Sequence, residues 1–210
     1  METAEFRDIL AAIIILTIVS SFTFVLDSQW SAVPQIFLFF VIIIVLSVFT
    51  KKAIAYALDS DVEHELWKIE RYGFSHTSHF KTPKLAGIII PLFFTLVSLG
   101  KFIVMPLLTY ETRALKHRAA KRHGFYSYTE MTDFHNALIG ASGIVILLIL
   151  SVVTYLTSFE HLAKLSTFYA FWNLLPISKL DGTQIFFGSR ILYSILAVIT
   201  LIFTIYALIL

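Results

Sequence analysis

Apolar residues gather into four long runs, none of which contains Asp, Glu, Lys or Arg. A transmembrane helix needs about 20 predominantly apolar residues to cross the hydrocarbon core of a bilayer. We therefore expect four full membrane spans. They cover Ile9–Leu26, Gln35–Phe49, Ala137–Leu156 and Ile191–Leu210.

Two further apolar segments, Leu85–Leu108 and Leu162–Gly188, contain residues that interrupt a helix. Pro91 and Gly100-Lys101 divide the first segment, and Pro176 divides the second. Proline lacks a backbone N–H and disfavours helix at the residue before it. We expect both segments to be broken or re-entrant rather than simple crossings.

Lys and Arg are distributed unevenly among the loops, which predicts how the spans are oriented. Basic loops lie on the cytoplasmic side of a membrane. With a cytoplasmic N-terminus, the loop 27–34, which has no Lys or Arg, lies outside. The basic loops Thr50–Lys84 and Thr109–Asn136 both lie inside only if Leu85–Leu108 turns back near Gly100-Lys101. The first run lacks a basic leader, so we expect it to remain as an uncleaved span.

Composition agrees with an integral membrane protein. Hydrophobic residues make up 58% of the 210-residue chain, and charged residues make up 14%. The mean hydropathy is +0.82. We expect residues 1–210 to form one all-α, polytopic helix bundle whose first partner is the lipid bilayer. The absence of Cys excludes thiol catalysis, and the net charge of +2 indicates no nucleic-acid partner.

The second broken segment holds the candidate binding residues, which are Asn173, Pro176, Asp181 and Gly182. A charged Asp at the centre of a membrane helix costs about 2.5–3.5 kcal/mol, so such residues usually have a function. Broken backbone at membrane depth is tolerated only inside protein or beside a wet cavity. We expect Asp181 to point into the bundle. The alternative is an Asp-Gly turn just outside the bilayer.

The pattern Asn-x-x-Pro-x-x-x-Leu-Asp-Gly over Asn173–Gly182 resembles the second signature of the site-2 proteases, which are intramembrane zinc metalloproteases. The next residues, Thr183–Arg190, resemble archaeal members, and the likeness extends weakly over about residues 35–190. The resemblance implies a prokaryotic cell membrane and a site-2-protease-like bundle, with strand-like structure after the first catalytic helix. It also implies that Asp181 holds the position of the third zinc ligand.

The other part of such a site is missing, because the chain contains no His-Glu-x-x-His. A zinc hydrolase takes two His ligands from one helix face and a Glu as general base. We expect a polar helix over about 53–72, where the family carries its zinc helix. One alignment places His64 and Glu65 at the first ligand and the base. Lys68 then occupies the second ligand position, and an ammonium group cannot coordinate zinc.

A second alignment, anchored on Arg71–Phe74, is preferred. It places Asp61 and Glu65 at the two ligand positions and Val62 at the general base. Together with Asp181, these carboxylates could hold a divalent cation such as magnesium or manganese. Valine accepts no proton from water, so hydrolysis would lack its base. The simpler alternative is that 53–72 is an amphipathic cytoplasmic helix with a solvated charged face.

The segment Ala141–Leu147 takes the place of the family's middle core helix, with Ile144 and Leu147 where Pro and Asn are expected. Gly140 and Gly143 still permit close helix packing. The basic run Lys116–Arg122 is interpreted as a surface for anionic lipid, with an acidic partner as the minority alternative.

The remaining histidines give weaker signals. His76 and His79 have a spacing that can chelate a metal, but without a third ligand we expect an interfacial loop. Four others stand among charges or at the ends of spans, where we expect interfacial positions. These are His117, His123, His135 and His161.

Three functional hypotheses follow. The preferred one is a non-catalytic member of the site-2 protease family that binds a membrane helix or a membrane protein partner, with no metal or other cofactor. The alternative is an intramembrane metallopeptidase with altered ligands, holding zinc or another divalent cation through Asp181, Asp61, Glu65 or His64. A small transporter built on a broken helix is the third.

Overall fold

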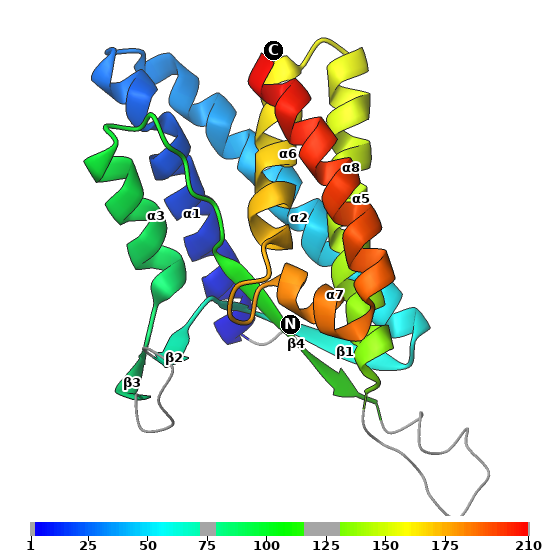
Figure 1. The fold of residues 1–210 in the computed structure, drawn as a ribbon. Coiled ribbons are helices and arrows are strands. Elements are labelled where there is room, and N and C mark those ends of the chain that lie inside the picture. The colour runs from blue at the N-terminus through cyan, green and yellow to red at the C-terminus, as the bar shows by residue number, and fades with distance from the viewer. Residues whose placement is uncertain (1–2, 72–78, 116–130, 210) are drawn as a thin grey trace, which may run out of the picture.

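The computed structural model describes residues 3–71, 79–115 and 131–209, and it is mostly helical (Figure 1). Four of its helices are long and apolar enough to cross a membrane, which fits an integral membrane protein. They are α1 (Thr3–Leu26), α2 (Val33–Ala57), α5 (Asp133–Leu156) and α8 (Arg190–Ile209). The first three each contain one of the predicted spans, and α8 covers the fourth up to Ile209, the last described residue. A short 3-10 turn, η1 (Trp30–Ala32), precedes α2.

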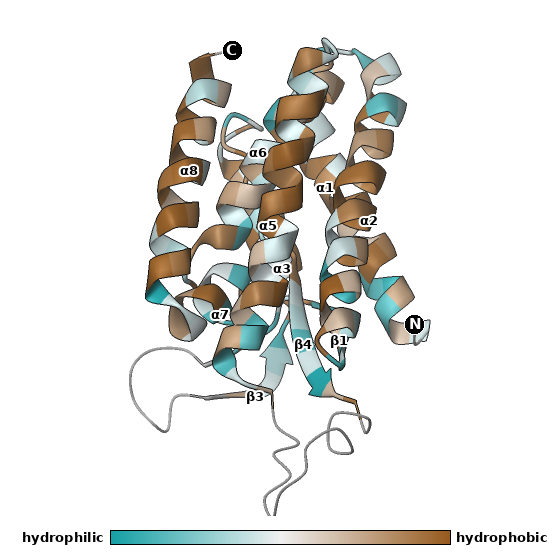
Figure 2. Ribbon diagram, turned by 90° about the vertical axis from the view of Figure 1, so that its right-hand side faces the viewer, coloured by the Kyte–Doolittle hydropathy of each residue, from teal (hydrophilic) through white to brown (hydrophobic). Residues whose placement is uncertain are grey.

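The helix α5 forms the centre of the bundle and packs against α2, α6, α7 and α8. Hydrophobic residues make up most of the long helices, whereas hydrophilic residues are more frequent toward the end of the molecule that carries the strands (Figure 2). The core includes Phe40, Ile44 and Leu147, which are fully buried. The polar end of the bundle therefore brings together the charged segments that separate the apolar runs in the sequence.

The segment Leu85–Leu108 turns back on itself, as predicted. It begins as α3 (Ala86–Val97), turns at Gly100 and returns as extended chain. Gly100 has a φ of 77°, a conformation that glycine adopts without steric cost. Both ends of the hairpin meet at Trp67: the Gly87 N–H donates to the Trp67 carbonyl at 2.9 Å, and the Trp67 N–H donates to the Leu107 carbonyl at 2.7 Å.

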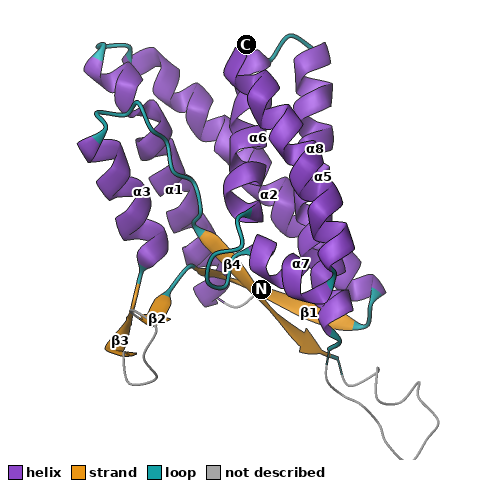
Figure 3. Cartoon of the chain, viewed as in Figure 1, coloured by secondary structure: helices purple, strands orange, loops and turns teal. Residues whose placement is uncertain are grey.

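Two small antiparallel sheets accompany the helices, so the chain is not all-α (Figure 3). The first pairs β1 (Ser60–Leu66) with β4 (Leu108–Ala114), with His64 opposite Tyr110. The second pairs β2 (Ile69–Arg71) with β3 (His79–Lys84).

The predicted polar helix over 53–72 is wrong beyond Ala57, where α2 ends. Asp59 has a φ of 53°, and a strand begins at Ser60. From Ser60 to Leu66, every second side chain is buried. This period of two is typical of a strand with one face against the core. The abundant Asp and Glu suggested a helix, but they occupy only the outer face of the strand.

The second broken segment is interrupted where the sequence predicts. Helix α6 (Glu160–Leu174) ends shortly before Pro176, and α7 (Asp181–Gly188) begins after six non-helical residues, 175–180. Ser178 within this break has a φ of 54°. Both flanking helices pack on α5, whereas residues 176–179 of the break are exposed and Leu180, just before Asp181, is buried.

Candidate functional site

Asp181 lies in the first turn of α7, and its side chain is only 2% exposed. The neighbouring Gly182 fixes this position. A Cβ atom at Gly182 would collide with the backbone carbonyl of Leu174, so the start of α7 packs directly on the end of α6. The predicted inward direction of Asp181 is confirmed.

The partner of Asp181 is Lys51, which comes from α2. The Lys51 Nζ donates to Asp181 Oδ2 at 2.5 Å, and the lysine side chain is 5% exposed. The ammonium also lies 4.8 Å from the centre of the Tyr110 ring, at a distance typical of a cation–π contact. The negative charge of Asp181, the hydrogen bond to it and the face of the Tyr110 ring together compensate the cost of burying the lysine.

Tyr110 belongs to β4 and closes the site from the strand side. Its hydroxyl donates to the Asn136 carbonyl on α5 at 2.7 Å. Burial raises the pKa of the Tyr110 phenol well above its ordinary value, and the negative charge of Asp181 raises it further. The phenol therefore stays neutral and remains a hydrogen-bond donor.

Two glycines of α5 make room for these side chains, as the sequence predicts. A Cβ at Gly140 would lie against the Tyr110 hydroxyl, and a Cβ at Gly143 would meet the side chains of Lys51 and Ser47. Ser47 precedes Lys51 by one helical turn of α2. The two residues therefore share the face of α2 that contacts Gly143.

A second buried group of charges lies between α1, α2 and β1. Lys52 Nζ donates to Glu5 Oε2 at 2.9 Å, and Glu5 Oε1 lies 3.1 Å from His64 Nδ1. The His64 backbone N–H also donates to Glu5 Oε1, at 3.2 Å. Burial lowers the pKa of His64, and the hydrogen bond to Glu5 partly offsets this shift. His64 Nε2 and Asp181 Oδ1 are buried and have no hydrogen-bond partner among the described residues.

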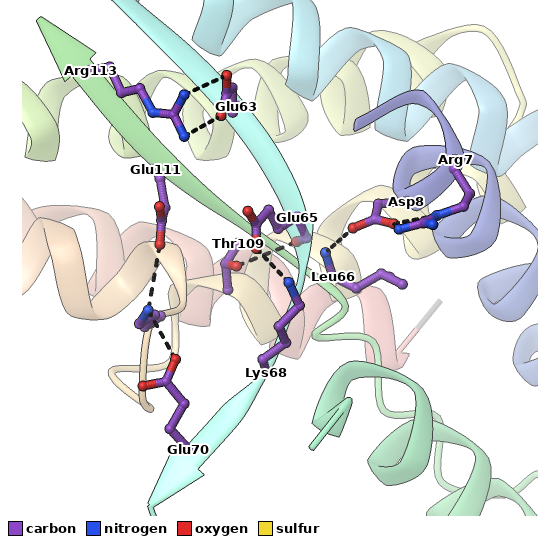
Figure 4. A network of polar contacts seen from close by, with 11 residues as sticks. Arg7, Asp8, Glu63, Glu65, Leu66, Lys68, Glu70, Thr109, Glu111 and Arg113 are labelled. Carbon is purple, nitrogen blue, oxygen red and sulfur yellow. Dashed lines mark hydrogen bonds and ion pairs between the residues drawn. The ribbon is translucent and has the colours of Figure 1, made fainter. Parts of the chain in front are cut away.

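The remaining charges of β1 face outward, away from this interior. Glu65 pairs with Lys68 at 2.7 Å, and both side chains are about 40% exposed (Figure 4). Asp61 is exposed on the same face. The structure therefore does not bring these three predicted site residues to Asp181. Val62 lies on the inner face and is fully buried in a small cluster with Tyr110.

The candidate residues Lys68 and Asn173 do not pair with Asp181. Asn173 instead donates from Nδ2 to the Tyr169 carbonyl at 2.8 Å. The sequence does not identify Lys51, because the predicted second span ends at Phe49. The helix in fact continues past Thr50 and Lys51 to Ala57, so a lysine two residues beyond an apolar run was the available signal.

The other candidate residues lie apart from this site. His76, His117, His123 and the run Lys116–Arg122 fall outside the described residues. His79 begins β3, and His135 lies in the first turn of α5. His161 packs edge-on against Phe24, with 5.7 Å between the ring centres. Within residues 3–71, 79–115 and 131–209, no three His, Cys, Asp or Glu side chains are grouped closely enough to hold a metal ion.

The fold and the site together fit a membrane helix bundle in which a buried Lys51–Asp181 pair joins α2 to the start of α7, just after the break that follows α6. Comparison with protein-family models, with curated proteins and with solved structures finds no match to this chain.

Proposed function

We propose that this chain is a non-catalytic member of the site-2 protease family that binds a transmembrane helix or membrane protein without cleaving it. The observation that carries the proposal is the ion pair between Lys51 and Asp181. The Asp of the family-like motif lies inside the bundle, where a metal ligand would be needed. A lysine ammonium, rather than a metal, neutralises it.

Helix α2 supplies the face that a zinc hydrolase would use. Such an enzyme takes two ligands four residues apart on one helix face, with a Glu following the first. On α2, Lys51 contacts Asp181, and Ser47 lies one turn earlier on the same face, so the positions of this motif correspond to Ser47, Val48 and Lys51. We propose this register in place of the two alignments expected from the sequence, because those alignments use residues of β1 and the turn after it.

The residues of this face do not fit a zinc ion. Lys51 carries a positive charge 2.5 Å from Asp181 Oδ2, and a protonated amine has no lone pair for a metal. Val48 offers neither a ligand nor a general base. A bundle with this interior can retain the shape that accommodates a membrane helix while lacking the chemistry for hydrolysis.

Exposed apolar surface supports a membrane-embedded partner. The hairpin helix α3 contacts α1, and it presents Phe93 and Val97, which are 58% and 68% exposed. At 1.5 Å per residue, its 12 residues extend for about 18 Å, too little to cross a hydrocarbon core of about 30 Å. A helix that enters the membrane without crossing it leaves room beside it for a partner helix.

Metal content and proteolysis of the purified full chain test the non-catalytic role. We expect no stoichiometric zinc and no cleavage of a transmembrane substrate. One zinc per chain, with cleavage that Asp181→Asn abolishes, would instead establish the altered-ligand hydrolase.

Restoring the motif tests the register on α2. The triple variant S47H/V48E/K51H should gain zinc, because it rebuilds two His and a Glu on the face toward Asp181. The matched control D61H/V62E/E65H rebuilds the same motif on β1, where we expect no comparable affinity. Zinc bound by the control but not by a folded α2 variant would contradict the register.

Partner binding is tested by photo-cross-linking in native membranes from position Phe93. We expect an adduct with a membrane protein. A control cross-linker at Phe187, which is 75% exposed on α7, should not give the same adduct. Adducts with lipid alone from Phe93 would argue against a partner at α3.

A further inference from the structure

A groove of about 240 Å³ lies between α5, α6 and α8. Val152 and Ile202 form part of its walls and are 42% and 60% exposed. Of the four long helices, α8 has the smallest buried share. In a membrane-spanning helix, surface that other helices leave uncovered faces acyl chains. The groove therefore opens toward the hydrocarbon of the bilayer.

Deep in the groove, the polar groups bond to one another. The Ser151 and Thr167 hydroxyls are 2.7 Å apart, and Ser151 Oγ also donates to the Ala163 carbonyl at 3.1 Å. Both side chains are buried. Because these hydroxyls are already bonded, they do not require a polar ligand. The groove beside them suits an apolar chain.

Polar groups are available at one end of the groove, near the connection between α5 and α6. The Tyr206 hydroxyl donates to the Tyr155 hydroxyl at 2.7 Å, so the Tyr155 hydroxyl keeps its own proton for another acceptor. Lys164 lines the groove as well, and among the described residues it has no ion-pair partner. Its long side chain can reach the membrane interface while its methylene groups stay in apolar surroundings.

A carboxylate lies close to the same end. Glu160 precedes Lys164 by one turn of α6, so the two residues lie on the same face of that helix. A ligand that carries only negative charge would therefore meet repulsion as well as attraction. A headgroup with both a phosphate and an ammonium group complements Lys164 and Glu160 together.

We propose that the groove binds a phospholipid with a zwitterionic aminoethyl headgroup, phosphatidylethanolamine. One acyl chain lies in the groove, the phosphate accepts from Lys164 and Tyr155, and the headgroup ammonium donates to Glu160. Charge-assisted hydrogen bonds of this kind are about twice as strong as neutral ones. This proposal does not depend on the relation to site-2 proteases.

Native mass spectrometry of the detergent-purified full chain tests the proposal, with phosphatidylethanolamine or phosphatidylglycerol added at equal concentration. We expect tighter retention of phosphatidylethanolamine. Lys164→Gln should weaken that retention by about tenfold, the effect of losing one charge-assisted contact. The matched control is Lys101→Gln, which removes an exposed charge at the turn after α3.

A second pair of variants tests the acyl-chain position independently of charge. Val152→Trp fills the groove and should reduce retention, whereas Val153→Trp adds the same bulk at a 51%-exposed neighbour that does not line it. Circular dichroism establishes that each variant is folded. Equal retention of the two lipids by the wild type, or unchanged retention by both Lys164→Gln and Val152→Trp, would overturn the proposal.

Discussion

Two lysine–carboxylate pairs of this chain have similar geometry and opposite surroundings. Lys51 and Asp181 lie 2.5 Å apart, and their side chains are 5% and 2% exposed. Lys68 and Glu65 lie 2.7 Å apart, with side chains that are 38% and 42% exposed. The first pair joins α2 to α7 across 130 residues of sequence, whereas the second spans three.

The difference shows that burial, rather than distance, decides what an ion pair does. An exposed pair gains little, since water and salt screen it and two long side chains lose freedom. A buried pair costs desolvation on both sides, and removing one partner leaves an uncompensated charge. The buried pair therefore constrains how α2 and α7 pack, and the exposed pair leaves the fold almost unaffected.

Breaking the buried pair should have the largest effect. We expect Lys51→Met or Asp181→Asn to lower the free energy of unfolding by about 3–5 kcal/mol, measured by denaturant titration in detergent. For Lys51→Met, the cost comes from the carboxylate left unpaired in the core. For Asp181→Asn, it comes from the unpaired ammonium.

The double variant Lys51→Met/Asp181→Leu sharpens this test. With both charges gone, most of the loss should be recovered, because a buried pair replaced by apolar residues is often neutral. Losses in the double variant equal to the sum of the two single losses would show that the two side chains do not act as a pair.

Disturbing the close contact at Gly182, which positions Asp181, should have the second-largest effect on stability. A methyl group at Gly182 would overlap the Leu174 carbonyl, so Gly182→Ala forces the backbones of α6 and α7 apart. We expect a loss of about 1–3 kcal/mol in the free energy of unfolding. Phe187→Ala on the exposed face of α7 is the control and should change it by less than about 0.5 kcal/mol. Equal losses would mean that the contact at Gly182 is not tight.

The sequence predicts the helical bundle well and this pair poorly, for identifiable reasons. Runs of about 20 apolar residues have few alternatives to a membrane helix, so the four spans were predictable. Pro176 likewise predicts the break before Asp181. A contact between Lys51 and Asp181 depends on how α2 and α7 pack, which no local pattern encodes.

The prediction of a helix in the polar segment after α2 is wrong because the burial of this segment follows the period of two of a strand. Asp61, Glu63 and Glu65 alternate with the buried Val62 and His64, which is a strand pattern. Within the candidate site, the sequence therefore identified Asp181 but assigned its partner to the wrong element. Asp61 and Glu65, four residues apart, would face Asp181 together as metal ligands only if this segment were a helix.

Acidification tests the interior next to the pair, with a smaller effect. Burial lowers the pKa of His64 below its ordinary value of 6.5, so the folded state binds a proton less readily than the unfolded state. The contribution of neutral His64 to the free energy of unfolding should be fully present above about pH 6.5. It should fall as the pH decreases toward the pKa of His64 in the folded state. The nearby charges of Glu5, Lys51 and Asp181 remain in place in His64→Gln, which should flatten this dependence. An unchanged slope in the variant would assign the effect to another group.

Breaking the exposed pair should have the smallest effect and completes the comparison. Lys68→Met or Glu65→Gln removes an ion pair that water already screens, so we expect a loss below about 1 kcal/mol. The hydrogen bond to Glu65 raises the pKa of Lys68, but the exposure of both groups reduces what that shift contributes to stability. At high salt, the free energies of unfolding of the wild type and of Lys68→Met, measured by denaturant titration, should become equal. The loss in Lys51→Met should persist at high salt. A loss from Lys68→Met as large as that from Lys51→Met would show that the outer face of β1 carries a structural or binding role.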